Sequence, residues 1–132
     1  MATKGTPHEG RDNIIAPRVY TGLSLGLYTN TADSLDDDTT LADLTQPTGT
    51  GYALVSLTGS WASADGVVTY DHGTPDEVVF ENTHASNNWS APVVGAFITD
   101  GTYLLHFHDA PEAPVTMTPG KKFVVDVQNI AG

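Results

Sequence analysis

The chain has 132 residues, no cysteine, and a formal net charge of −11 from 16 acidic and five basic residues. The lack of cysteine excludes a disulfide framework, a thiolate metal site and a cysteine nucleophile, and the strong negative charge argues against binding to nucleic acid or to an anionic membrane. The length predicts one domain, the first residues predict no secretory signal, and no apolar run is long enough for a transmembrane helix.

The first 17 residues predict an extended arm, because glycine and proline are spread among polar residues there. The rest of the chain, 18–132, is expected to form a single β domain. Its first strand is predicted over residues 18–28, where apolar residues recur at every second position. The apolar face of this strand holds Val19, Leu23, Leu25 and Leu27.

A long polar loop is predicted over residues 29–51, with one short helical turn at 38–44 that Asp38 would cap. Further strands are expected at short spacing, and Asp100-Gly101 is the strongest hairpin signal between two of them. They are predicted at 52–57, 67–70, 77–81, 93–99, 102–108, 113–117 and 122–128.

This pattern predicts an all-β fold, either a β-sandwich or a jelly-roll-like barrel of about eight short strands. No amphipathic helix of ten residues is present in the sequence. The segment 93–98 is apolar on both faces, which is typical of a central strand. In the last strand, Phe123 and Val125 are expected to face inward, while Lys122 and Asp126 face outward and Val124 breaks the alternation.

The sequence His106-Phe107-His108 is the strongest candidate for metal chemistry. Alternate residues of a strand point to the same side, so both imidazoles could bind one metal ion, with Glu112 as a further ligand. The spacing is close to the first metal motif of cupins, but no histidine follows His108 to complete the set. A pair of surface or interface histidines is the favoured interpretation, and the sequence predicts no metal, no cofactor and no catalytic residue.

Three other patterns have weaker chemical meaning. Gly22-Leu23-Ser24-Leu25-Gly26 matches the nucleophile-elbow motif, but it lies inside an alternating strand with no helix after it. The acidic run Asp36-Asp37-Asp38 offers oxygen ligands for calcium but lacks the spacing of a known loop, so a solvated acidic loop is favoured. Trp61 and Trp89 could stack on sugar rings, although packing in the core or at strand ends is favoured.

Several segments together resemble small structural proteins of tailed phages or archaeal tailed viruses, over residues 20–128. The segments that carry the resemblance are Leu25–Asn30, Asp38–Thr45, Gly51–Ala53, Trp61, Val78–Phe80, Val93–Gly101 and Leu104-Leu105. The resemblance implies a β-sandwich protein of the virion, and it carries over no catalytic residue. The chain departs from the group at Thr45-Gln46-Pro47 and at His106-Phe107-His108.

The leading hypothesis is a capsid decoration, or cement, protein and not an enzyme, because a compact β body with an N-terminal arm suits binding to the outside of a shell. The expected partners are the major capsid protein and further copies of the same chain, with a homotrimer on the capsid surface as the natural arrangement. Nucleic acid and membrane are not expected partners. The alternatives are a tail or baseplate component, a carbohydrate- or receptor-binding module, and a small cupin-like metal enzyme.

Overall fold

The computed structural model describes residues 4–5, 7, 19–20, 23–57, 60–64, 67–71 and 77–126. Every strand pair in this part of the chain is antiparallel, and its one helical element is the short 3-10 turn η1 (Leu41–Asp43). The all-β class predicted from the sequence is therefore confirmed. Within the same residues, no helix has the length and apolar character needed to cross a bilayer.

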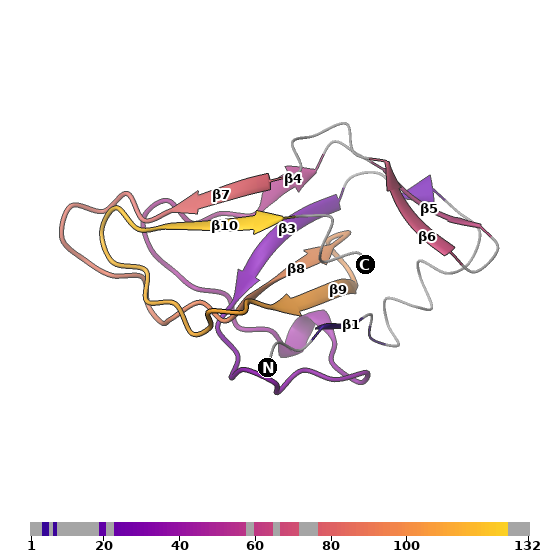
Figure 1. The fold of residues 1–132 in the computed structure, drawn as a ribbon, viewed down its shortest axis with the longest axis horizontal. Helices are drawn as coiled ribbons and strands as arrows, with labels where there is room; N and C mark the ends of the chain where they lie inside the picture. The colour runs from indigo at the N-terminus through magenta and orange to yellow at the C-terminus, as the bar shows by residue number, and fades with distance from the viewer. Residues whose placement is uncertain are drawn as a thin grey trace.

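The strands of the described residues form three sheets (Figure 1). The largest has the order β1 (Lys4–Gly5), β9 (Leu104–Asp109), β8 (Gly95–Thr99), β3 (Leu23–Tyr28) and β4 (Val55–Leu57). A two-stranded ribbon pairs β10 (Lys122–Asp126) with β7 (Glu77–Glu81). The third sheet has the order β2 (Val19–Tyr20), β5 (Ser60–Ala64) and β6 (Val67–Asp71).

One face of the five-stranded sheet packs against the ribbon β7–β10, and we call this contact the first core. The sheet contributes the alternating leucines of β3, with Ala96 and Ile98 of β8, and the ribbon contributes Phe80, Phe123 and Val125. The alternation predicted for β10 is confirmed, because Phe123 and Val125 are buried while Val124 is exposed. The central position predicted for 93–98 is also confirmed, since every residue of β8 is buried between β3 and β9.

The opposite face of the same sheet is covered by the loop that follows β3, and we call this contact the second core (Figure 1). Here Tyr28, Phe97 and Phe107 project from the sheet, while Leu35 and its neighbours project from the loop. Gly26 makes room for the ring of Phe97, because a Cβ atom at position 26 would lie 2.5 Å from that ring. The irregular loop after β3 therefore buries the second face of the sheet, where a further layer of strands would pack in other folds.

The predicted strand 18–28 is wrong as a single element. Residues 19–20 form β2, which pairs with β5, whereas residues 23–28 form β3, which pairs with β4 and β8. Period two reports that a segment is extended, but it does not report which partner the segment pairs with. The strand β5 was not predicted at all, because its Ser and Ala residues give no apolar alternation.

The predicted strand 113–117 is also wrong, since only Val115 forms a bridge, to Val93. Pro114 has no N–H to donate to a ladder, which limits the pairing of this segment. The predicted helical turn exists as η1, but its cap is Thr40, whose backbone N–H donates to the Asp43 carboxylate at 2.9 Å. The Asp100-Gly101 hairpin is confirmed: it joins β8 and β9, and Gly101 has a φ of 98°.

The predicted arm falls mostly outside the described residues. Lys4 and Gly5 belong to β1, which pairs with β9 at the edge of the large sheet, and Pro7 is buried. The sequence also predicts turns at Asp65-Gly66 and His72-Gly73, and both lie outside the described part of the chain.

Candidate functional site

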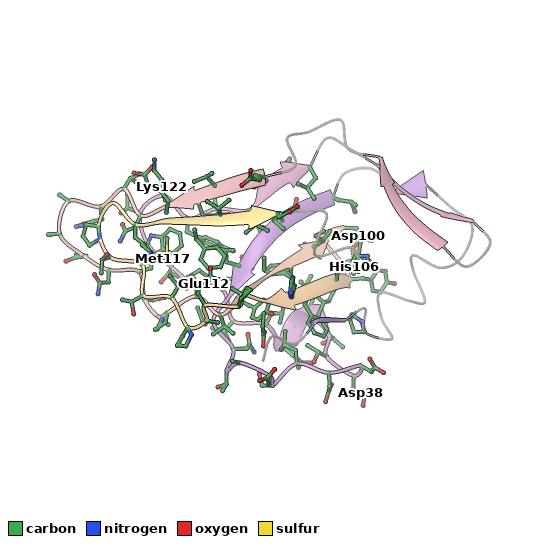
Figure 2. All side chains as sticks on the ribbon, in the orientation of Figure 1. Asp38, Asp100, His106, Glu112, Met117 and Lys122 are labelled. Atoms are coloured by element: carbon green, nitrogen blue, oxygen red, sulfur yellow. The ribbon has the colours of Figure 1, made fainter. Side chains whose placement is uncertain are left out.

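The three candidate metal ligands are separated by the structure into two places. His106 lies on β9 opposite Ile98, on the face of the sheet that forms the first core, and it is only 2% exposed. His108 lies on the same side of β9 and is partly exposed, as period two predicts. Figure 2 shows His106 toward the Asp100 turn and Glu112 beyond the other end of β9.

The prediction of a surface pair is therefore wrong for His106, which is a core histidine. It is buried because β9 is an interior strand, with β1 on one side and β8 on the other, and because its partner Ile98 belongs to the first core. Its Nε2 atom makes no hydrogen bond within the described residues, although the residue has other interactions.

His108 and Glu112 line a common cavity of about 180 Å³. The cavity opens where the loop after β9 passes the edge of β10 that β7 does not cover. Its lining combines apolar side chains with the polar side chains of His108, Glu112 and Asp126. The lining residues are Ala96, His108, Ala110, Pro111, Glu112, Phe123, Val124, Val125 and Asp126.

The polar lining of this cavity combines one imidazole with two carboxylates, those of Glu112 and Asp126. Such groups are typical metal ligands, but within the described residues no set of three His, Asp or Glu side chains is arranged to hold a metal ion. The arrangement is suited instead to hydrogen bonding and to attracting positive charge. Sequence reasoning selected His108 and Glu112 but missed Asp126, whose outward position on β10 was predicted without its role in the cavity.

A second polar group is buried on the other face of the sheet. The Tyr28 hydroxyl donates a hydrogen bond to Oδ1 of Asp109 at 2.6 Å, and the backbone N–H of Asp33 donates to Oδ2 at 2.7 Å. Burial raises the pKa of Tyr28 well above its ordinary value, and the hydrogen bond to Asp109 and its negative charge add to the effect. Tyr28 is therefore a neutral donor over the whole physiological range of pH.

This pair has a structural role. It ties the end of β3 and the end of β9 to the loop at Asp33, whose φ is 60°. Gly95 makes room for it, because a Cβ atom at that position would lie 2.3 Å from both the Tyr28 hydroxyl and the carbonyl oxygen of His108. The sequence contains no local sign of this contact, because Tyr28 and Asp109 are 81 positions apart.

Trp89 lies in the first core and is 5% exposed. Its ring meets Tyr52 edge to face, with centroids 5.5 Å apart, and its indole N–H donates to the carbonyl oxygen of Thr50 at 3.0 Å. The predicted packing role is confirmed for Trp89, and its buried ring has no face available for a sugar. The side chain of Trp61 lies outside the described part of the chain.

The acidic run is organised by its own backbone. Oδ1 of Asp36 accepts hydrogen bonds from the backbone N–H of Asp38 and from the Thr39 hydroxyl, as in a turn closed by an aspartate side chain. Asp38 lies at the lower edge of the view, apart from Glu112 (Figure 2). Ser24, from the elbow-like motif, lies inside β3 between Ser56 and Thr99, so the sharp turn that the motif requires is not formed there.

No protein-family model matches this sequence, and no curated protein and no solved structure is significantly similar to it.

Proposed function

We propose that the chain is a structural protein of a tailed-virus particle, and specifically a decoration protein that binds the outer capsid shell and joins neighbouring capsomers. In this proposal its partner is the major capsid protein, and its copies associate as a homotrimer at symmetry axes of the shell. The finer architecture is part of the proposal: the packed sheets form a β-sandwich, and residues 1–17 form an N-terminal arm, of which Lys4 and Gly5 pair with β9.

The observation that carries the proposal is an exposed apolar pair on the outer face of the ribbon. Val79 and Val124 are direct cross-strand partners, and they are 53% and 49% exposed. Large exposed apolar patches mark sites of protein contact, and we assign the same role to this smaller pair. Because the ribbon is backed by the first core, the pair is held in a fixed position, as a repeated contact with a regular shell requires.

The charge of the chain supports an outer location. A net charge of −11 keeps particles that carry many copies from adhering to one another. The Val79–Val124 contact point is small and apolar, so it can bind a partner despite this charge. The same features suit a tail or baseplate component, which the experiment below separates from a decoration protein.

The test is binding to undecorated shells assembled from the major capsid protein encoded beside this chain. We expect the purified protein to sediment with the shells, and Val79→Asp to weaken that binding at least tenfold, because a carboxylate would be buried at the contact. Leu54→Asp is the matched control, since Leu54 is 46% exposed but immediately precedes β4 of the five-stranded sheet and is not part of the ribbon. It should bind as the unmodified protein does.

Cryo-electron microscopy of the shells with and without the protein gives the location. Density on the outer surface at symmetry axes supports decoration, and a mass measurement in solution checks for a trimer. If the protein does not sediment with shells but is found in the tail of the particle, the tail assignment replaces the capsid one. If it is absent from the particle, the proposal as a whole is wrong.

A further inference from the structure

We propose that the cavity lined by His108, Glu112 and Asp126 binds one cationic side chain, an arginine or a lysine, of a partner protein. The site lies on the edge of β10, beside the exposed valines of the ribbon. It extends the proposed function by naming the chemistry of the contact, and it rests on that function only in requiring that a partner protein exists.

The size of the cavity selects a single side chain. Its volume of about 180 Å³ is below the roughly 300–1,000 Å³ of pockets that enclose drug-sized molecules. A cofactor or a sugar ring with its substituents would not be enclosed. A side chain that enters end-on, with a long stem and a compact polar head, matches a cavity of this size.

The charges around the cavity select a cation. Two of the lining side chains are carboxylates, and Glu77, which does not line the cavity, lies directly opposite Asp126 in the ribbon. Like charges directly opposite one another on a sheet are unfavourable, and a cation bound beside them removes part of that cost. The net charge of −11 also steers positively charged partners toward the molecule.

The one basic residue of β10 lies away from Asp126. Lys122 is at the other end of the strand, opposite Glu81, and four residue steps of extended chain, about 13 Å, separate it from Asp126. The two ends of the ribbon therefore differ in charge: one pairs opposite signs and the other pairs equal signs. Asp126, which lines the cavity, is at the end with equal signs.

The apolar part of the cavity lining suits the rest of such a side chain. Ala96, Phe123 and Val125 provide an apolar surface for the methylene groups of arginine or lysine, which pack on apolar surface while the charged head stays polar. Charged anchors that enter a pocket beside apolar contacts are the residues that dominate many protein interfaces.

The experiment is a titration of the full chain, labelled with ¹⁵N, followed by NMR. The probes are the Nα-acetyl amides of arginine and lysine, with the Nα-acetyl amide of citrulline as the neutral counterpart of arginine. We expect saturable shifts of the backbone amides at residues 108–112 and 124–126 with at least one cationic probe. Citrulline should bind at least tenfold more weakly, because it lacks the charge.

Two double variants separate the cavity from the general charge of the protein. Glu112→Gln with Asp126→Asn should weaken binding of the cationic probe at least tenfold. Asp37→Asn with Asp38→Asn removes the same charge at a distant loop and should change the affinity less than twofold. All four residues are exposed, so both proteins should fold, and the spread of the amide signals checks this.

Preference for arginine identifies a guanidinium site, and preference for lysine identifies an ammonium site; either result supports the proposal. Equal binding of arginine and citrulline, an absence of saturable shifts with both cations, or equal loss in the two double variants would overturn it. The probes are small molecules, so this result is independent of shell binding. A chain that binds the probe but not the shell leaves the cavity assigned and the capsid role wrong.

Discussion

The two faces of the five-stranded sheet are covered in different ways. The first core is made between two sets of regular strands and consists of apolar side chains with His106 at its margin. The second core is made between strands and an irregular loop, and it includes the buried hydrogen bonds of Tyr28 and Asp109. Regular strands satisfy their own backbone groups, whereas a covering loop must have its backbone satisfied by other means.

The loop over the second core is held by hydrogen bonds at both of its ends. Near β3, the backbone N–H of Thr29 donates to the carbonyl oxygen of Thr45 at 2.8 Å, and the Asn30 side chain bonds to Asp43 and Thr45 at 2.9 Å each. Farther along, Asp109 holds the backbone of Asp33. The ribbon β7–β10 is therefore held on the sheet by packing, whereas the loop after β3 is held by hydrogen bonds together with packing.

The largest expected effect comes from matched leucine substitutions in the two cores. Leu25→Ala should lower the free energy of unfolding by about 3–5 kcal/mol, because the two facing sheets cannot collapse into the cavity it leaves. Leu35→Ala should cost about 2–3 kcal/mol, since the loop that carries Leu35 can move toward the sheet. Urea unfolding followed by tryptophan fluorescence measures both values, and equal losses would show that the loop is as rigid as the ribbon.

The next effect tests the hydrogen bonds of the second core. Asp109→Ala leaves the Tyr28 hydroxyl and the Asp33 N–H without their acceptor, at about 1–3 kcal/mol for each buried group. We expect faster amide hydrogen exchange in the loop residues 33–39, and unchanged exchange in the ribbon β7–β10. Faster exchange at both places would mean that the loop and the ribbon unfold as one unit.

The sequence predicted the first core better than the second. The alternating leucines of β3 and the alternation of Phe123 and Val125 in β10 predict which face of each strand is buried, because successive side chains of a strand point to opposite sides. The second core depends on contacts between residues far apart, such as Tyr28 with Asp109. A loop has no residue period, so no pattern around Leu35 indicated that its side chain packs against the sheet.

The candidate site was predicted only in part, for the same reason. The strand period placed His106 and His108 on one side of β9, but it did not show that His106 would be buried. The cavity brings His108 and Glu112 together with Asp126 of β10. Five-residue strands give no information about which strand edge faces which loop, so Asp126 could not be assigned to the cavity in advance.

A smaller expected effect is the pH dependence of the free energy of unfolding, which should differ between the tyrosines of the two cores. The pKa values of Tyr28 and Tyr52 are both raised, mainly by burial, so each tyrosine keeps its proton in the folded state after it has lost it in the unfolded chain. Their stabilising contribution is complete below about pH 10 and declines above it, by about 1.4 kcal/mol per pH unit for a fully protonated group. Tyr28→Phe should remove the contribution of Tyr28, in the second core, to this decline of the free energy of unfolding with pH.

Urea unfolding at several pH values between 9 and 11.5 measures this dependence. Tyr52→Phe should reduce the slope less, because Tyr52 is only partly buried and a backbone hydrogen bond from Leu27 opposes the rise in its pKa. If Tyr28→Phe leaves the slope unchanged, Tyr28 ionises in the folded protein, and its hydrogen bond to Asp109 is not the constraint described above.

The smallest expected effect lies in the ribbon that covers the first core. Glu77 is opposite Asp126, a pair of like charges, whereas Glu81 is opposite Lys122, a pair of opposite charges. Glu77→Gln should therefore raise the free energy of unfolding by a few tenths of a kcal/mol, and Glu81→Gln should lower it by a similar amount. Thermal unfolding in low salt measures both, and 1 M salt should reduce both differences, because it screens exposed charges. Effects of the same sign in the two variants would mean that overall charge, and not the cross-strand partner, sets the stability of this cover.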